Sequence, residues 1–273
     1  MKDPVIVGKV GSMALIRQDD NDVNYNIIAR IASQLRPGMV WITSGAAEIG
    51  RVDYMRRHKR TLDEDKLDAK TDYASQGQMI LMQNYRQFIP PEFSVRQILV
   101  EHQHFNDPEK REHIRRLLLR CASQGAIPIV NYNDPVSVEE NRRFELANLR
   151  ENGAEPVECV DNDETAAVIA ELLGADILVI LTSADGLYED PSDRSTLIRE
   201  IIAAEPDELE RKINTMKELC RGASRAGANG MAAKLQYVIR PAKSGTQVII
   251  GNAKYRISEL IEGAVPRTYI GLN

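Results

Sequence analysis

The feature that most constrains the fold is a repeated alternation of short β-branched runs with longer segments that carry apolar residues at helical spacing. Residues 24–35 place Ile27, Ile28 and Ile31 on one helical face, and a Pro-Gly pair follows them. Residues 40–43 are then a β-branched and aromatic run. Such alternation is typical of parallel strands joined by crossover helices.

The same pattern recurs along the chain. Asp107 and Pro108 predict the start of a helix that Gly125 ends, and residues 127–130 predict a strand. Asp163 is expected to cap a helix that ends at Gly174. Further strands are predicted at residues 5–7, at 177–181, where the run is apolar enough to be buried on both faces, and at 247–250.

Length and composition narrow the class of protein. A chain of 273 residues with 43% hydrophobic content can build one large α/β domain, with a weak boundary near residues 152–153. A net charge of −5 argues against a protein that coats nucleic acid. Three widely spaced cysteines and the lack of a long apolar segment predict a cytoplasmic protein without membrane or nucleic-acid partners.

Ligands of open α/β sheets collect beyond the carboxyl ends of the strands. This rule selects residues 8–12, 43–47, 131–134 and 182–188. The first is a glycine-flanked turn in which Lys9 can meet a phosphate or lie on the surface. Residues 229–234 predict a turn opening a short helix, where Lys234 has the same two interpretations. Neither segment is a Walker A loop or a dinucleotide fingerprint.

Polar residues cluster at 131–134 and 161–163, where they can recognise a small ligand or serve turns and helix caps. His102 and His104 alternate as on a strand, but two histidines without a third ligand rarely bind a metal ion, and no protein metal site is expected.

Many of these short segments together resemble, in order, the signatures of the glutamate 5-kinases of the amino acid kinase superfamily. The matching segments are residues 7–12, 43–46, 76–78, 127–134, 161–163, 172–176, 186–188 and 230–235. The resemblance implies a three-layer α/β/α sandwich with a mainly parallel sheet, in one domain over residues 1–273. Within it, residues 1–152 would bind the acceptor and residues 153–273 the nucleotide. The C-terminal PUA domain common in the family is expected to be absent, and a homo-oligomer is expected.

Matching positions imply roles for individual residues. Lys9 and Lys234 would neutralise the phosphoryl group in transfer, and Asp163 would orient both lysines. Residues expected to bind the acceptor are Ser44, Gly45, Asn131, Asp134 and Asn162. Residues expected at the nucleotide are Gly11, Ser12, Thr182, Ser183, Gly186, Tyr188, Gly230 and Met231. ATP is the implied phosphoryl donor and Mg²⁺ the implied cofactor.

The leading hypothesis is phosphorylation of the γ-carboxylate of glutamate, the first step of proline biosynthesis. Two alternatives stay open. Tyr132 stands where the family has glutamate, which favours another carboxylate, carbamate or phosphate acceptor. Ala228, Asn229 and Ala233 replace threonine, glycine and threonine of the last glycine motif, which favours a catalytically weak, ligand-sensing relative.

Overall fold

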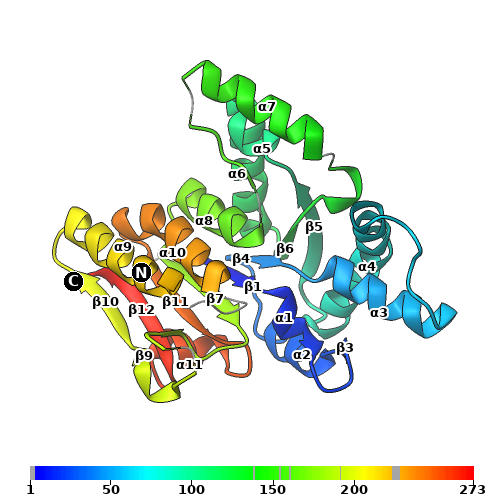
Figure 1. Ribbon diagram of the computed structural model, residues 1–273, viewed down its shortest axis with the longest axis horizontal. Helices are drawn as coiled ribbons and strands as arrows, with labels where there is room; N and C mark the ends of the chain where they lie inside the picture. The colour runs from blue at the N-terminus through cyan, green and yellow to red at the C-terminus, as the bar shows by residue number, and fades with distance from the viewer. Residues whose placement is uncertain (1–3, 138, 154, 160, 191, 223–227) are drawn as a thin grey trace. The chain divides into compact units, whose positions relative to one another are not determined.

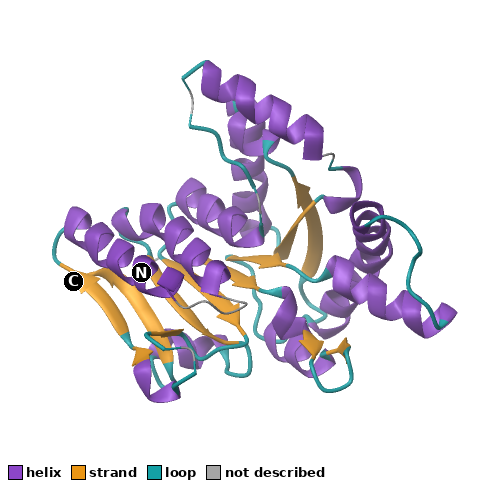
Figure 2. Cartoon of the chain, in the orientation of Figure 1, coloured by secondary structure: helices purple, strands orange, loops and turns teal. Residues whose placement is uncertain are grey.

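The computed structural model describes residues 4–137, 139–153, 155–159, 161–190, 192–222 and 228–273 (Figures 1 and 2). They form two compact units. Unit 1 comprises the chain up to Val10 together with Asp163–Asn273, and unit 2 comprises Gly11–Asn162. The assignment of acceptor and nucleotide to residues 1–152 and 153–273 stays a prediction.

Unit 1 is built on five strands in the order β10-β12-β11-β7-β1. They are β1 (Ile6–Val10), β7 (Ile177–Thr182), β10 (Glu200–Ala203), β11 (Gln247–Asn252) and β12 (Arg267–Leu272). β7 lies parallel to both β1 and β11, whereas β12 runs antiparallel to β11. Residues 177–181 are all buried, as their apolar run predicted.

The helices of unit 1 are α8 (Asn162–Leu173), α9 (Pro206–Gly222), α10 (Ala228–Lys243) and α11 (Ile257–Glu262). Figure 1 shows α9 and α10 side by side along one face of the strands and α11 on the other. Gly251 of β11 lies so close to α11 that a β-carbon there would come within 2.4 Å of Leu260. A small hairpin, β8 (Leu187–Tyr188) with β9 (Leu197–Ile198), follows β7.

Unit 2 contains three parallel strands in the order β4-β6-β5. They are β4 (Met39–Thr43), β5 (Ser94–Val100) and β6 (Ala126–Tyr132), and a hairpin of β2 (Ile16–Arg17) and β3 (Asp22–Val23) precedes them. Every residue of β4 and β6 is buried, because helices cover both faces of a parallel sheet.

The helices of unit 2 are α1 (Ser12–Leu15), α2 (Tyr25–Ala32), α3 (Ala46–His58), α4 (Lys66–Phe88), α5 (Gln103–Asn106), α6 (Pro108–Ser123) and α7 (Glu139–Glu151). Two of them, α2 and α6, lie where the sequence predicted helices. Asn24 caps α2, and Asp107 caps α6 by accepting from two backbone N–H groups at 2.9 Å. Gly125 after α6 has the predicted left-handed backbone, with φ of 59°.

Helices α3 and α4 cross at two glycines. A β-carbon at Gly50 would lie 1.8 Å from the carbonyl oxygen of Tyr73, and one at Gly77 would lie 1.8 Å from that of Ala46. The two backbones can approach this closely only because neither position carries a side chain. This close crossing fixes the position of α4 at Gly77, and with it the position of the next side chain, that of Gln78.

The mainly parallel strands with flanking helices confirm the predicted α/β fold class. Four local expectations were wrong. Lys9 lies inside strand β1 rather than in a turn, and α10 is a long helix rather than a short one. The segment with His102 and His104 lies at helix α5 because Glu101 and His102 accept its first backbone N–H groups. Helix α8 begins at Asn162, so Asp163 lies in its first turn instead of capping it.

Candidate functional site

Three charged side chains meet inside unit 1. Asp163 is 4% exposed, and its Oδ1 lies 2.8 Å from the Lys9 Nζ. Its Oδ2 lies 2.8 Å from the Lys234 Nζ. The structure therefore brings the three predicted catalytic residues together on one carboxylate, and we call them the lysine–aspartate triad.

Each member of the triad comes from a different element of unit 1. Strand β1 holds Lys9 beside Ile180 of the parallel strand β7 and leaves the lysine 4% exposed. Asp163 lies in the first turn of α8, where the helix dipole favours a negative charge. Lys234 projects from the second turn of α10. The positions depend on packing between distant segments, which no local sequence pattern specifies.

The electrostatics of the triad favour an added anion. Burial alone raises the pKa of Asp163, but the ammonium groups of Lys9 and Lys234 outweigh it and hold this pKa below its usual value. Two cations on one anion leave a net charge of about +1 in a buried position. An incoming anion would therefore be stabilised here.

A second group of polar side chains meets inside unit 2. The Asn162 Nδ2 donates to the Ser44 Oγ at 3.1 Å and to the Asn131 Oδ1 at 2.9 Å. The Asn131 Nδ2 donates to the Gln78 Oε1 at 2.8 Å. These four residues form a chain of neutral hydrogen bonds, which we call the amide relay.

The relay joins three predicted acceptor-binding residues to Gln78, which lies in the resembling segment 76–78 but was assigned no role from the sequence. Ser44 follows β4, Asn131 is the last residue but one of β6 and Asn162 begins α8, so the ends of these elements bring them together. Gln78 comes from the middle of α4, where a glutamine ordinarily faces water. The signal that could have identified it is Gly77, whose close contact with α3 buries this part of the helix.

Two further acceptor candidates lie near these strand ends without bonding to the relay. Gly45 has a φ of 97° and precedes the first turn of α3, where free backbone N–H groups can face an anion. The Asp134 Oδ1 forms an ion pair with the Lys70 Nζ at 3.0 Å. Lys70 is 59% exposed, so the Asp134 carboxylate keeps a partner that a ligand could displace.

The nucleotide candidates fall into three segments. In unit 1, Thr182 is the last residue of β7 and Ser183 follows it, and the Thr182 hydroxyl accepts from the Ala184 N–H at 3.0 Å. Gly186 and Tyr188 lie in the segment that follows β7. Gly230 and Met231 lie in the first turn of α10, the helix whose second turn carries Lys234. Gly11 precedes α1 of unit 2, and Ser12 is the first residue of that helix.

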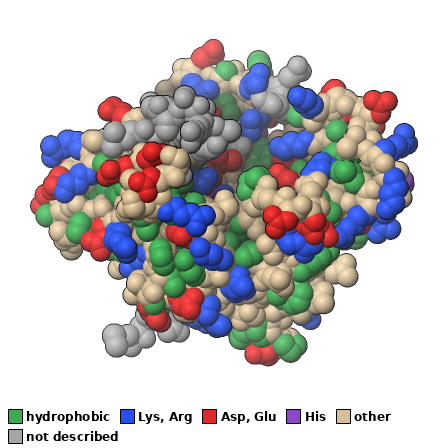
Figure 3. All heavy atoms as spheres, turned by 60° about the horizontal axis from the view of Figure 1, so that its bottom comes forward, with side chains coloured by type: hydrophobic (Ala, Val, Ile, Leu, Met, Phe, Trp, Pro, Cys, Tyr) green, Lys and Arg blue, Asp and Glu red, His purple; other side chains and the backbone are tan. Residues whose placement is uncertain are grey.

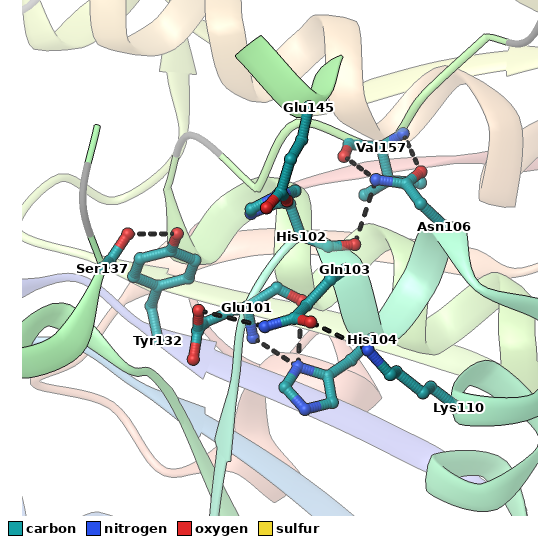
Figure 4. Close-up of polar contacts among 10 residues, drawn as sticks. All are labelled: Glu101, His102, Gln103, His104, Asn106, Lys110, Tyr132, Ser137, Glu145 and Val157. Atoms are coloured by element: carbon teal, nitrogen blue, oxygen red, sulfur yellow. Dashed lines mark hydrogen bonds and ion pairs between the residues drawn. The ribbon is translucent and has the colours of Figure 1, made fainter. Parts of the chain in front are cut away.

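The connection from β6 to α8 is held by side chains of the β5–α6 corner, which Figure 4 shows. The His102 Nε2 lies 2.6 Å from the Glu145 Oε2 of α7. The Asn106 side chain pairs with the backbone of Val157 in both directions, at 2.8 and 2.7 Å. The Tyr132 hydroxyl bonds to the Ser137 Oγ at 2.8 Å, and burial raises its pKa. These contacts fix the backbone leading to Asn162.

Among the described residues, no group of three or more His, Cys, Asp or Glu side chains is arranged to hold a metal ion. The helices in this part of the chain include none with the length and apolar character to span a bilayer. Lysine, arginine and acidic side chains are interspersed on the face drawn in Figure 3, in keeping with the net charge of −5.

Comparisons with solved structures agree with the fold. A carbamate kinase from Giardia lamblia superposes with a TM-score of 0.57 at 14% identity, covering 98% of both chains. An isopentenyl phosphate kinase from T. acidophilum gives 0.56 at 13% identity, covering 98% of this chain and all of the other. At such low identity these likenesses establish the architecture alone.

Comparisons of sequence are more specific. A glutamate 5-kinase of Alkaliphilus metalliredigens is 28% identical over 98% of this chain and 95% of its own length. One from Streptococcus uberis is 30% identical over 91% of this chain and 87% of its own length. For one from Thermoanaerobacter sp. the identity is 30% over 91% of this chain, which spans 62% of that relative.

The sequence profile of the amino acid kinase family matches residues 4–252, nearly the whole chain. The match includes all three residues of the triad and all four of the relay. The chain belongs to the amino acid kinase family.

Proposed function

We propose that this protein transfers the γ-phosphoryl group of ATP to the γ-carboxylate of L-glutamate and forms γ-glutamyl phosphate, the first step of proline biosynthesis. The observation that carries the proposal is the lysine–aspartate triad, in which two ammonium groups converge on one buried carboxylate. The names of the sequence relatives supply the choice of glutamate as acceptor.

The acceptor needs no general base in this reaction. A side-chain carboxyl with an ordinary pKa of about 4.3 is ionised at neutral pH. One of its oxygens attacks the γ-phosphorus while the bond from that phosphorus to the β,γ-bridging oxygen breaks, and ADP leaves with the electron pair. Catalysis is thereby reduced to placement of the reactants and stabilisation of charge.

The triad would stabilise that charge. Negative charge spreads over the transferred group as the bonds exchange, and prearranged cations lower the barrier most where water is excluded. Lys9 is buried, and both lysines are already oriented by Asp163, so little reorganisation is required. We assign Lys9 and Lys234 to charge neutralisation and Asp163 to their orientation.

The relay and Asp134 would bind the amino acid. Ser44, Asn131 and Asn162 are neutral, so they can orient a substrate with two carboxylates without repelling it. We assign the Asp134 carboxylate to the substrate ammonium group, in competition with the exposed Lys70.

The donor set is compatible with magnesium that arrives bound to ATP. In kinases Mg²⁺ is held mainly by substrate phosphates and water, with one or two carboxylates of the protein, so a dedicated cluster of ligands is not required. When bound, the ion would neutralise phosphate charge. Within unit 1 we assign the nucleotide to the segments 182–188 and 230–231, while Gly11 and Ser12 stay a prediction. We also propose a cytoplasmic location for this enzyme, where the buried Cys121 would be a free thiol.

The test is a hydroxamate assay. The protein is incubated with ATP, Mg²⁺, hydroxylamine and one acceptor from a panel that includes glutamate, aspartate, acetate and carbamate, and hydroxamate and ADP are measured. Glutamate-dependent formation of both products is expected. Turnover with another acceptor alone would reassign the substrate, and binding of ATP or glutamate without turnover would indicate a ligand-sensing relative.

A further inference from the structure

Gln78 is a buried amide whose position is fixed by its backbone. It is 7% exposed and follows Gly77, the residue at which α4 presses against α3. Its Oε1 accepts from the Asn131 Nδ2 at 2.8 Å, while its Nε2 has no hydrogen-bond partner among the described residues. An unpaired amide N–H that water cannot reach destabilises the fold, so its retention calls for a reason.

The direction of the relay is set by the backbone. The Tyr132 N–H donates to the Asn131 Oδ1 at 2.9 Å, so that oxygen cannot be exchanged with the amide nitrogen without placing two donors face to face. With Asn131 fixed, its nitrogen donates to Gln78 and its oxygen accepts from Asn162. Gln78 must therefore turn its oxygen toward Asn131 and keep its N–H groups for another partner.

The other end of the relay carries the complementary atom. Both hydrogens of the Asn162 Nδ2 are used, by Ser44 and by Asn131, and the buried Asn162 Oδ1 has no partner among the described residues. The relay thus ends in an unpaired donor at Gln78 and an unpaired acceptor at Asn162. A ligand that pairs both must present an acceptor oxygen and an N–H donor.

We infer that Gln78 is an acceptor-binding residue that determines specificity: its N–H end donates to the carboxylate next to the ammonium group of an α-amino acid, while Asn162 accepts from that ammonium group. The inference rests on the proposed function and extends it to a residue outside the expected acceptor set. It also favours α-amino acids over acceptors that carry no N–H or O–H donor next to a carboxylate.

The experiment couples a change in Gln78 to a change in the substrate. Glutamate is compared with 4-aminobutyrate, which is glutamate without its α-carboxylate, in wild type, Gln78→Met and Gln78→Glu. Methionine removes the donor at similar volume. Glutamate at position 78 keeps an oxygen for the Asn131 Nδ2 but places a negative charge where the donor was. The readouts are kcat and KM for each acceptor and for ATP.

Gln78→Met is expected to raise the KM for glutamate ~10- to 100-fold and to leave the KM for ATP within about 2-fold, because one hydrogen bond to a charged group is lost. Its effect on 4-aminobutyrate is expected to be under about 3-fold, since that ligand has no group to lose. Gln78→Glu is expected to weaken glutamate more than Gln78→Met does. A purely positioning role predicts the reverse order, because Gln78→Glu preserves the contact with Asn131.

Asn84→Leu is the matched control. Asn84 lies on the same helix and is also 7% exposed, but its Nδ2 donates to the carbonyl oxygen of Ile80 in its own helix. Its substitution is expected to change thermal stability without changing the preference for glutamate over 4-aminobutyrate. Equal effects of Asn84→Leu and Gln78→Met on that preference, or an unchanged preference in Gln78→Met, would overturn the inference.

If the protein lacks the proposed kinase activity, the role of Gln78 can still be tested separately by binding. If the wild type turns over no glutamate, calorimetric titration with glutamate and with 4-aminobutyrate replaces the kinetics. Binding of glutamate that Gln78→Met selectively weakens would sustain the role of Gln78 while refuting the kinase activity. Absence of binding of either compound to the wild type would refute both. If Gln78→Met does not fold, the test uses Gln78→Glu alone and measures its change in the preference for glutamate over 4-aminobutyrate.

Discussion

The two polar centres of this protein handle buried polarity in opposite ways. In unit 1, the triad places two ammonium groups on a single carboxylate, so polarity is buried as paired opposite charges. In unit 2, the relay links neutral amides and a hydroxyl through hydrogen bonds, carries no charge, and leaves one donor and one acceptor unpaired among the described residues. Both centres lie where strands end or helices begin, yet their physical properties differ.

The difference indicates a division of labour. A centre with excess positive charge attracts any anion and responds to the charge that develops in a reaction, so it suits catalysis. Neutral amides have fixed donor and acceptor directions and discriminate between ligands by the partner atoms they offer. Substitutions in the triad should therefore act on kcat, and substitutions in the relay on the acceptor KM.

The largest expected effect is on the triad. Lys9→Ala or Lys234→Ala is expected to reduce kcat at least ~100-fold, because a prearranged cation is lost from the transferred group. Steady-state kinetics with saturating ATP and glutamate measure the change. Lys9→Ala should also lower thermal stability more than Lys234→Ala, because Lys9 is the more deeply buried partner of Asp163.

Lys254→Ala provides the control for that pair. Lys254 also belongs to unit 1 and pairs with Asp185 at 2.8 Å, but its side chain is 46% exposed. Its removal is expected to leave kcat within about 2-fold, as for other surface ion pairs. Near-normal kcat in both triad variants would remove the lysines from the mechanism and abolish the proposed contrast between the two centres.

A second prediction concerns Asp163 and pH. Since its folded-state pKa is below the unfolded value, the carboxylate stabilises the fold above the unfolded pKa of about 3.9, and this contribution is lost as pH falls through the folded pKa. Asp163→Asn should flatten that part of the stability profile and reduce kcat about 10- to 100-fold, because the lysines lose their orienting charge.

Urea unfolding of both proteins between pH 2 and pH 7 measures the first effect. The substitution leaves the neutral relay untouched, so the acceptor Kd at pH 7 should change less than ~3-fold. Identical acid profiles for the wild type and Asp163→Asn would show that the triad does not carry the depressed pKa assigned to it.

A smaller effect is expected from the relay. Asn162→Ala removes the donor to both Ser44 and Asn131 and should raise the acceptor KM ~10-fold, with kcat reduced less than ~3-fold. Because the relay is uncharged, this rise in the acceptor KM should be the same at low and high salt. The effect of Lys234→Ala on the KM for ATP should instead depend on salt. A fall in kcat with an unchanged acceptor KM would assign Asn162 to catalysis instead.

Local structure was the most predictable part of the molecule. Side chains that act within a few residues, such as the caps at Asn24 and Asp107, carry their signal in the sequence beside them. Strand β12 was missed although Thr268, Tyr269 and Ile270 favour a strand, because the run is short and Gly271 interrupts it. The start of α8 was misplaced by two residues because Asp161, Asn162 and Asp163 are all suitable helix-start residues.

The polar centres were less predictable from physical chemistry alone. Lys9 and Lys234 meet through strand order and helix packing, which local periodicity does not encode, and the family resemblance was the reason to pair them. Gln78 lies in the resembling segment 76–78 but was given no role, because a glutamine on a helix is buried only when that helix packs as closely as the two glycines allow. Long-range contacts between polar groups are thus the information that the sequence pattern lacks.

The smallest effect is expected at the ion pair between Asp134 and Lys70. Lys70→Met removes the exposed partner of Asp134 and should lower the acceptor KM by at most ~3-fold, since Lys70 no longer competes with the substrate ammonium group. The change should vanish for glutarate, which lacks that ammonium group, and Lys66→Met, on the same helix, serves as the control. An equal change for glutamate and glutarate would mean that Lys70 acts on the substrate carboxylates. The neutral character of acceptor binding in unit 2 would then have to be abandoned.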